Sequence, residues 1–282
     1  MKSLNKLQIG VIAFSVLVFV LLYFANKTPE KKAEDFTSEN KGAVSGPGMK
    51  VFVDTKISTL PDSLKKIFTA LNKQSEANQK DNALLDSLTD FWDRIMQPDV
   101  AAFYTEKIAI NTNNAESWFK AGERYYYAVR FVKSPEEIRA LYQQAMVCFE
   151  KGLKFEPGNV EARIRYASCF VEGAEFIGTD PMKGIGMLRE LEKTDSSNIN
   201  LQLAFAAFST KSGQLDKAIV RFEKVLRLKP DYLEAYLYLA DAYEQMGDKK
   251  KTIETLEKYA TLVPDKDAKK EINKYIDKLK SN

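Results

Sequence analysis

The side chains that usually carry out catalysis or bind metals are scarce in this sequence. Its 282 residues include no histidine and only two cysteines, Cys148 and Cys169. Histidine is the commonest general base and the commonest metal ligand, so neither a Ser-His-Asp nor a Cys-His arrangement can be built. Two cysteines without histidine do not complete an ordinary structural zinc site. The sequence therefore predicts no enzyme activity, no metal and no cofactor.

The two cysteines allow two interpretations. Cys148 and Cys169 fall on consecutive predicted helices, at similar distances from the turn near residue 158. Antiparallel packing would place the thiols at a similar height, so they could form a disulfide if their faces meet in an oxidising compartment. Buried free thiols are the favoured interpretation, because free cysteine is among the most buried residue types.

Two other patterns have simple structural explanations. Gly184-x-Gly186 lacks a third glycine and follows a helix start at Asp180 rather than a strand, so it does not predict a phosphate-binding loop. Glu136 and Glu137 suit the first turn of a helix, where negative charge is favourable. The net charge is only +3, and the basic residues form no stripe. The sequence therefore predicts neither a nucleic-acid partner nor a small-molecule substrate.

One apolar run near the N-terminus predicts a transmembrane anchor, which with its short flank occupies residues 1–25. Leu7 to Ala25 contains no charged residue, and a helix of this length spans roughly 28 Å, close to the thickness of the hydrocarbon core. The alternative is a cleaved signal peptide, which ends in small residues. The run ends in Tyr23-Phe24-Ala25, so the uncleaved anchor is favoured.

The next segments are predicted from composition and periodicity. Residues 26–59 are expected to be a flexible linker, because Gly, Ser and Pro are dense between residues 42 and 48. A brief alternation at Val51 and Val53 suggests a short extended piece. Residues 60–114 are expected to form helices that pack on the following solenoid, since their apolar residues recur at helical spacing.

The C-terminal half repeats itself with a period of 34 residues. The pairs that match at this spacing include Phe205 with Leu239, Ala206 with Ala240, Gly213 with Gly247, Ile219 with Ile253, and Pro230 with Pro264. A period of this length is typical of stacked helix-turn-helix units.

An earlier segment carries the clearest motif. Its residues are Trp118, Gly122, Tyr125, Ala145, Phe149 and Pro157. These residues resemble the pattern of tetratricopeptide-repeat (TPR) proteins, of the N-terminally membrane-anchored kind found in bacterial envelopes. The resemblance implies an all-α solenoid, coiled as a right-handed superhelix. It contains an extended repeat at 115–159, a degenerate one at 160–198, two more at 199–232 and 233–266, and a capping helix at 267–282. The extra residues of the first repeat are expected to lengthen both of its helices.

The same resemblance implies where a partner would bind. In TPR proteins a partner usually lies in the concave groove lined by the first helix, helix A, of each repeat. The residues expected to bind a protein segment there are Phe119, Tyr126, Tyr127, Arg165 and Tyr238. The alternative for the tyrosines is packing within a lengthened helix. The carboxylate clamp of the family is absent, because Phe119 and Glu123 stand at its first Lys and Asn positions.

These features together predict a non-enzymatic, membrane-anchored scaffold or adaptor. The membrane contact is residues 7–25, and the partner is a protein of unknown identity. Because the flanking lysines are nearly balanced, the very short N-terminal flank decides the orientation. We expect an inner-membrane protein whose repeats face the periplasm and aid the folding or assembly of envelope proteins. The alternative is a constitutive structural subunit of a large membrane complex.

Overall fold

The computed structural model describes residues 48–281. The predicted anchor at residues 7–25, and most of the predicted linker, lie outside this range. Within residues 48–281 the chain is all helical and contains no strand. No helix in this part of the chain is both long enough and apolar enough to cross a membrane.

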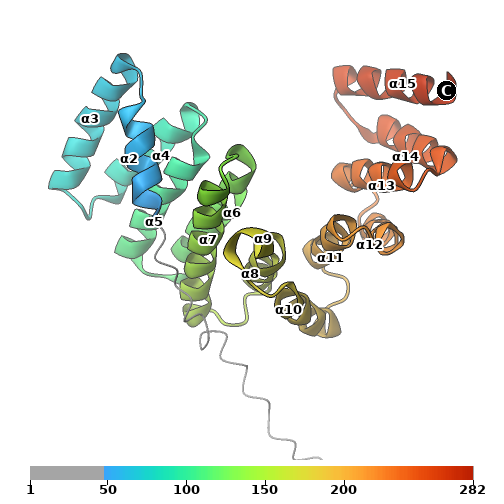
Figure 1. The fold of residues 1–282 in the computed structure, drawn as a ribbon, viewed down its shortest axis with the longest axis horizontal. Helices are drawn as coiled ribbons and strands as arrows, with labels where there is room; N and C mark the ends of the chain where they lie inside the picture. The colour runs from blue at the N-terminus through green and yellow to red at the C-terminus, as the bar shows by residue number, and fades with distance from the viewer. Residues whose placement is uncertain (1–47, 282) are drawn as a thin grey trace, which may run out of the picture. The chain divides into compact units, whose positions relative to one another are not determined.

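The helices follow one another with short connections (Figure 1). Four of them precede the predicted repeats: α2 (Met49–Ser58), α3 (Asp62–Ala77), α4 (Asn82–Arg94) and α5 (Pro98–Thr112). Those of the predicted repeats are α6 (Ala115–Ala128), η1 (Val129–Phe131), α7 (Pro135–Phe155), α8 (Val160–Glu172), α9 (Ala174–Ile177), α10 (Pro181–Thr194), α11 (Ile199–Lys211), α12 (Leu215–Leu228), α13 (Leu233–Gln245) and α14 (Lys249–Leu262). The last is α15 (Lys266–Ser281).

The helix α2 corrects the expectation of a linker and an extended piece up to residue 59. Met49 and Val53 are buried one helical turn apart, which is the spacing of one helix face. Val51, which suggested an alternating strand, is 50% exposed. Lys56 also forms an ion pair of 2.5 Å with the buried carboxylate of Asp99 on α5. Helix α2 therefore docks through both apolar and charged contacts.

Each predicted repeat range contains one pair of packed helices. These pairs are α6 with α7, α8 with α10, α11 with α12, and α13 with α14. Asparagine side chains cap three of the first helices: Asn114 accepts from the backbone N–H of Ser117, Asn159 from Ala162, and Asn198 from Leu201. Such caps satisfy N–H groups that have no partner inside the helix.

The extra length of the first repeat is not shared between its two helices as expected. Helix α6 has 14 residues, close to the 13 of α8, whereas α7 has 21. The chain leaves α6 through the short turn η1, and α7 then begins at Pro135, with Ser134 as its cap. A proline is well tolerated only in the first turn of a helix. The Ser-Pro pair therefore fixes where the long helix begins.

Helices α4 and α5 form a further pair of the same kind, outside the repeats predicted from the sequence. A shift of 33 residues superimposes the buried face of α4 on that of α6. The matched pairs are Leu85 with Trp118, Leu88 with Ala121, Thr89 with Gly122, and Trp92 with Tyr125, all of them buried. Because Thr and Trp replace the usual Gly and Tyr, the motif is not recognisable here although the packing is retained.

The core is a series of clusters between neighbouring helices, as expected for a solenoid. A Cβ atom on Gly122 would lie 2.9 Å from the ring of Phe149, so α6 and α7 approach closely at the small residue that the motif predicts there. The largest cluster surrounds these two helices. The cluster under the terminal helix α15 contains only Ala240, Leu256 and Ile276 as buried residues.

Candidate functional site

The first helices of successive pairs share one surface, which we call the A-helix face. It consists of the second, fifth, sixth, ninth, twelfth and thirteenth residues of α4, α6, α8, α11 and α13, although some of these side chains, such as those of Ile164 and Ser168, are buried beneath it. Polar contacts join successive helices across it: Arg165 Nε donates to Glu123 Oε1 over 3.1 Å, and Asn200 Nδ2 donates to Glu161 Oε2 over 2.7 Å. Helix α13 is included because it is the first helix of the last predicted repeat.

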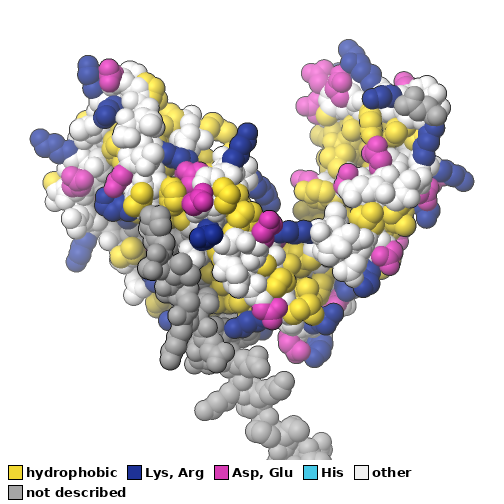
Figure 2. Space-filling model, viewed as in Figure 1, with side chains coloured by type: hydrophobic (Ala, Val, Ile, Leu, Met, Phe, Trp, Pro, Cys, Tyr) yellow, Lys and Arg dark blue, Asp and Glu magenta, His cyan; other side chains and the backbone are white. Residues whose placement is uncertain are grey.

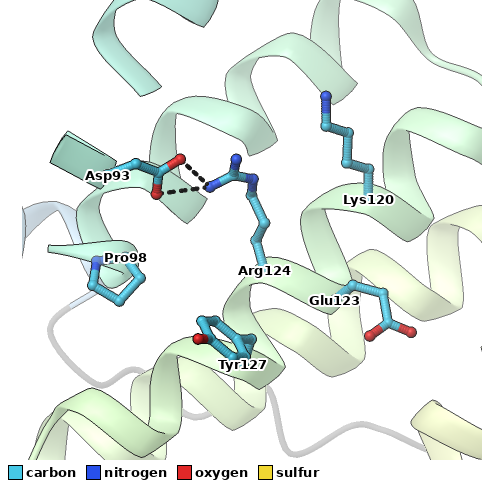
Figure 3. Close-up of a pocket in the computed structure, with 6 residues that line it drawn as sticks. All are labelled: Asp93, Pro98, Lys120, Glu123, Arg124 and Tyr127. Atoms are coloured by element: carbon cyan, nitrogen blue, oxygen red, sulfur yellow. Dashed lines mark hydrogen bonds and ion pairs between the residues drawn. The ribbon is translucent and has the colours of Figure 1, made fainter. Parts of the chain in front are cut away.

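A pocket of about 540 Å³ opens on this face between α4, the start of α5 and α6. Its lining residues are Asp93, Pro98, Lys120, Glu123, Arg124 and Tyr127. Figure 3 shows that four of them project from α6 and that the guanidinium of Arg124 reaches across to Asp93. Its Nη1 lies 3.0 Å and 2.9 Å from the two carboxylate oxygens. This ion pair joins α4 to α6, whereas Lys120 forms no ion pair among the described residues.

Tyr127 presents an aromatic surface at the rim of the pocket. Its side chain is 49% exposed, and that of Phe131 on η1 is 43% exposed. Their ring centroids lie 5.0 Å apart, and the Arg130 guanidinium sits 5.7 Å from the centre of the Tyr127 ring. The two half-exposed rings thus form one contiguous aromatic surface.

Two of the residues predicted to bind a partner make packing contacts between helices. Tyr126 is 8% exposed, and its hydroxyl donates to Glu172 Oε1 over 2.6 Å. Burial raises the pKa of Tyr126 well above its usual value, and the charge of Glu172 raises it further. The ring of Phe119 is partly buried and lies where a Cβ on Gly152 would be. Both side chains therefore hold α6 against its neighbours.

Arg165 has a mixed role. Its side chain is 34% exposed, forms the ion pair with Glu123, and stacks its guanidinium 5.3 Å from the centre of the Tyr126 ring. Burial raises the pKa of Glu123 despite the opposing effect of Arg165. The guanidinium is thus held by Glu123 and by the Tyr126 ring, while about a third of the side chain remains exposed.

Tyr238 lies on a separate part of the A-helix face. It is 55% exposed and stacks on Phe222 of α12, with ring centroids 5.6 Å apart. Its neighbour Leu237 is 37% exposed. The five predicted residues therefore fall into a group on α6 and α8, and a single tyrosine on α13.

The sequence does not single out several residues of the pocket, or Phe131 beside it. Asp93 could have been found by treating α4 as a repeat helix, because it then occupies the twelfth position of that helix. Lys120 occupies the sixth position of α6, on the A-helix face, but nothing in the sequence marks it as a binding residue. Phe131 lies in the turn after α6, where the repeat pattern defines no position. Arg124 depends on a contact between helices that the sequence does not show.

The cysteines lie apart from this surface. Cys148 and Cys169 are both buried and unpaired, which agrees with the favoured interpretation, and burial raises the pKa of each thiol well above its usual value. Residues 48–281 contain no group of three or more Cys, Asp or Glu side chains that could hold a metal ion.

Similar architectures occur among solved structures. A tetratricopeptide-repeat protein from Parabacteroides merdae superimposes with a TM-score of 0.52 at 15% identity, over 81% of this chain and 85% of that one. The chain has the tetratricopeptide-repeat fold. YrrB, a TPR protein with an unusual peptide-binding site, gives a TM-score of 0.41 at 18% identity, over 73% of this chain and 98% of its own. MamA from Desulfovibrio magneticus gives 0.44 at 18% identity, over 64% and 94%.

Comparisons at the sequence level are more limited. The family model of regulator of microtubule dynamics proteins 1–3 matches residues 192–281, from the end of α10 to α15. The search of curated proteins finds no match. The TPR assignment of this chain therefore rests on its helix pairs and on the likeness of folds.

Proposed function

We propose that this chain is a non-enzymatic scaffold that binds a segment of another protein along its A-helix face. The observation that carries the proposal is an exposed aromatic pair. It is formed by Tyr127, which lines the pocket between α4 and α6, and Phe131, which contacts the Tyr127 ring. Large aromatic side chains are the usual anchors of protein interfaces, because they bury much area at a small cost in conformational entropy.

The polar residues around this anchor have a supporting role. The pairs Asp93–Arg124 and Glu123–Arg165 hold α4, α6 and α8 together, so the surface is formed before a partner arrives. We propose that Tyr127, Arg165 and Tyr238 contact the partner directly. Phe119 and Tyr126 support them from beneath, since both side chains pack between helices.

The proposal is tested by crosslinking and affinity capture of the full-length protein from its native membrane. Wild type is compared with the double variant Tyr127→Ala/Phe131→Ala, and partners are quantified by mass spectrometry. The matched control is Phe155→Ala, which removes a 50% exposed aromatic side chain from the end of α7. Loss of a defined partner set in the double variant alone supports the proposal, whereas unchanged capture contradicts it.

The same experiment addresses a second role, that of a constitutive subunit held through the second helices. Exposed apolar side chains on those helices favour it: Val147 on α7 is 38% exposed, and Val220 on α12 is 58% exposed. A subunit docked in this way would lose its partners in Phe155→Ala and keep them in the double variant.

We further propose that residues 7–25 anchor the chain in an inner membrane, with the repeats in the periplasm. The support is the uncharged apolar run of the sequence. Alkaline extraction should leave the full chain in the membrane pellet and release a variant that lacks residues 1–25. Protease added outside spheroplasts should digest the repeats. If the repeats are protected from the protease until the spheroplasts are lysed, they face the cytoplasm and the proposed orientation is wrong.

A further inference from the structure

The A-helix face differs in charge from the chain as a whole. The sequence has 42 basic and 39 acidic residues, but acidic residues predominate on this face. The carboxylates are Asp86, Asp90, Asp93, Glu116, Glu123, Glu161, Glu172, Glu234, Asp241 and Glu244, against the cations Arg94, Lys120, Arg165 and Lys211. The excess of cations over the whole chain is therefore reversed on the surface that we propose as the binding face.

Within residues 48–281, most of these carboxylates form no ion pair. Of the ten, only Asp93 and Glu123 are paired with described cations, Arg124 and Arg165. Other polar contacts on the face involve uncharged donors: tyrosine hydroxyls bond to Glu172 and Glu244, and asparagine amides bond to Glu161. An unbalanced set of carboxylates favours a partner of opposite charge.

On α13 this charge surrounds exposed apolar area. Leu237 and Tyr238 are 37% and 55% exposed, and they lie between Glu234 and Asp241. Residues three or four apart are neighbours on a helix surface, so a carboxylate stands one turn away on either side of Tyr238. Figure 2 shows hydrophobic and acidic side chains next to each other at the surface over α13 and α14.

Neither of these two carboxylates is paired with a cation in the part of the chain that the structure describes. Glu234 forms no ion pair among the described residues, and Asp241 accepts only from the amide of Gln245. Tyr238 is held by its stack on Phe222. The nearest cation on the preceding first helix, Lys211, donates to the backbone carbonyl of Glu172. The described residues therefore provide no salt-bridge partner for Glu234 or Asp241.

We propose that the α13 surface, defined by Glu234, Leu237, Tyr238 and Asp241, binds a basic amphipathic segment of another protein. An apolar side chain of that segment packs on Leu237 and Tyr238, and Lys or Arg residues about one helical turn to either side pair with the two carboxylates. This inference rests on the proposed function, since it names the chemistry of a partner of the A-helix face.

The test begins with a displayed library of random 16-residue peptides, selected on the full-length protein in nanodiscs. Counter-selection uses two variants, Leu237→Ala/Tyr238→Ala and Tyr127→Ala/Phe131→Ala, so that each recovered peptide is assigned to a surface. Peptides that depend on the α13 surface should carry net positive charge, with basic residues flanking an apolar one. Peptides of neutral or negative charge on that surface would overturn the inference.

Binding of one such peptide, labelled with a fluorophore, is then measured by anisotropy. Glu234→Lys/Asp241→Lys should weaken it about tenfold, as expected for two exposed charge pairs replaced by repulsion. The matched control is Asp216→Lys/Glu254→Lys, which makes the same change in net charge at exposed positions of α12 and α14. A peptide with Glu in place of its basic residues should bind the Glu234→Lys/Asp241→Lys variant better than it binds wild type, because the charges are then reversed on both sides.

The remaining outcomes separate this inference from the proposed function. If only peptides that depend on Tyr127 are recovered, the scaffold proposal stands and the α13 inference falls. If neither surface yields peptides, both fall. Equal weakening by the control variant would show a general effect of net charge and would also overturn the inference. Sedimentation of the protein alone tests whether a second copy of the chain occupies the α13 surface instead. If the protein self-associates and Glu234→Lys/Asp241→Lys abolishes this, the occupant is a second copy and the proposed partner is wrong.

Discussion

The two glycines of α10 offer a test of how closely α8 and α10 pack. A Cβ added to Gly184 would lie 2.5 Å from the backbone oxygen of Ala167 and 2.8 Å from a methyl group of Val171, whereas one added to Gly186 meets nothing within 4 Å. The two positions lie two residues apart in one helix. Alanine at either position therefore changes the backbone preference equally but changes packing only at Gly184.

The magnitudes follow from two opposing effects. Replacing glycine by alanine inside a helix stabilises it by about 1 kcal/mol. Adding a methyl group to a tightly packed contact costs about 1–3 kcal/mol, and here the nearest atom belongs to a backbone that cannot rotate away. We expect Gly186→Ala to stabilise the chain by up to about 1 kcal/mol. Gly184→Ala should be less stable than Gly186→Ala by about 1–3 kcal/mol.

The assay is unfolding of the full chain in urea, followed by circular dichroism. Because arrays of repeats do not always unfold in one step, hydrogen exchange of α8 and α10 is measured by mass spectrometry in parallel. Gly184→Ala should lose protection in these two helices. Equal stability of the two variants would refute the close approach of α8 to α10, and with it the packing that positions the α8 part of the A-helix face.

Three further predictions concern the interior of the protein. Tyr125→Phe should destabilise the chain by about 1–3 kcal/mol in urea unfolding, because it removes the hydroxyl that donates to the buried Glu106 over 2.8 Å; an unchanged midpoint would show that Glu106 finds another donor. Lys56→Ala should expose Met49–Ser58 to hydrogen exchange, since it leaves the carboxylate of Asp99 buried without a cation; full protection of that helix would contradict this reasoning. Stability should fall as the pH rises above about 10. Burial raises the folded-state pKa of several tyrosines above the usual 10.0, so the unfolded chain loses its tyrosine protons first. Ultraviolet absorbance follows tyrosine ionisation, and a full tyrosine titration without unfolding would contradict the prediction. The tyrosines concerned are Tyr104, Tyr125, Tyr126, Tyr142, Tyr166 and Tyr243, the last with a pKa of about 12.

The repeating part of the fold could be predicted because its packing constrains residue size at fixed intervals. Gly122 must be small where α6 meets Phe149, and Ala206 and Ala240 occupy equivalent buried positions. Helix α2 was missed because its buried residues follow a glycine-rich stretch, so that composition outweighed the spacing of Met49 and Val53. The helical spacing was present in the sequence but covers only three turns.

The candidate site was less accessible from the sequence. Periodicity places a residue on a face of its helix, but it does not say how far the neighbouring helix covers that face. Tyr126 and Tyr127 are adjacent, yet the first is 8% exposed and the second 49% exposed. Phe119 fits into space left by Gly152, thirty-three residues away on α7. Such contacts depend on pairs of positions in different helices, which one sequence does not identify.

The small cluster under α15 has a consequence for the turnover of the protein. Each helix pair is stabilised by its neighbours, and the last cluster has only three buried residues, so local unfolding is least costly at this end. A protease would therefore remove α15 first and then reach α14 and α13. The α13 surface would be lost while α4, α6 and α7, with the largest cluster, remain folded. If both proposed contacts exist, a partly degraded chain would keep the one at Tyr127 after it had released the basic partner.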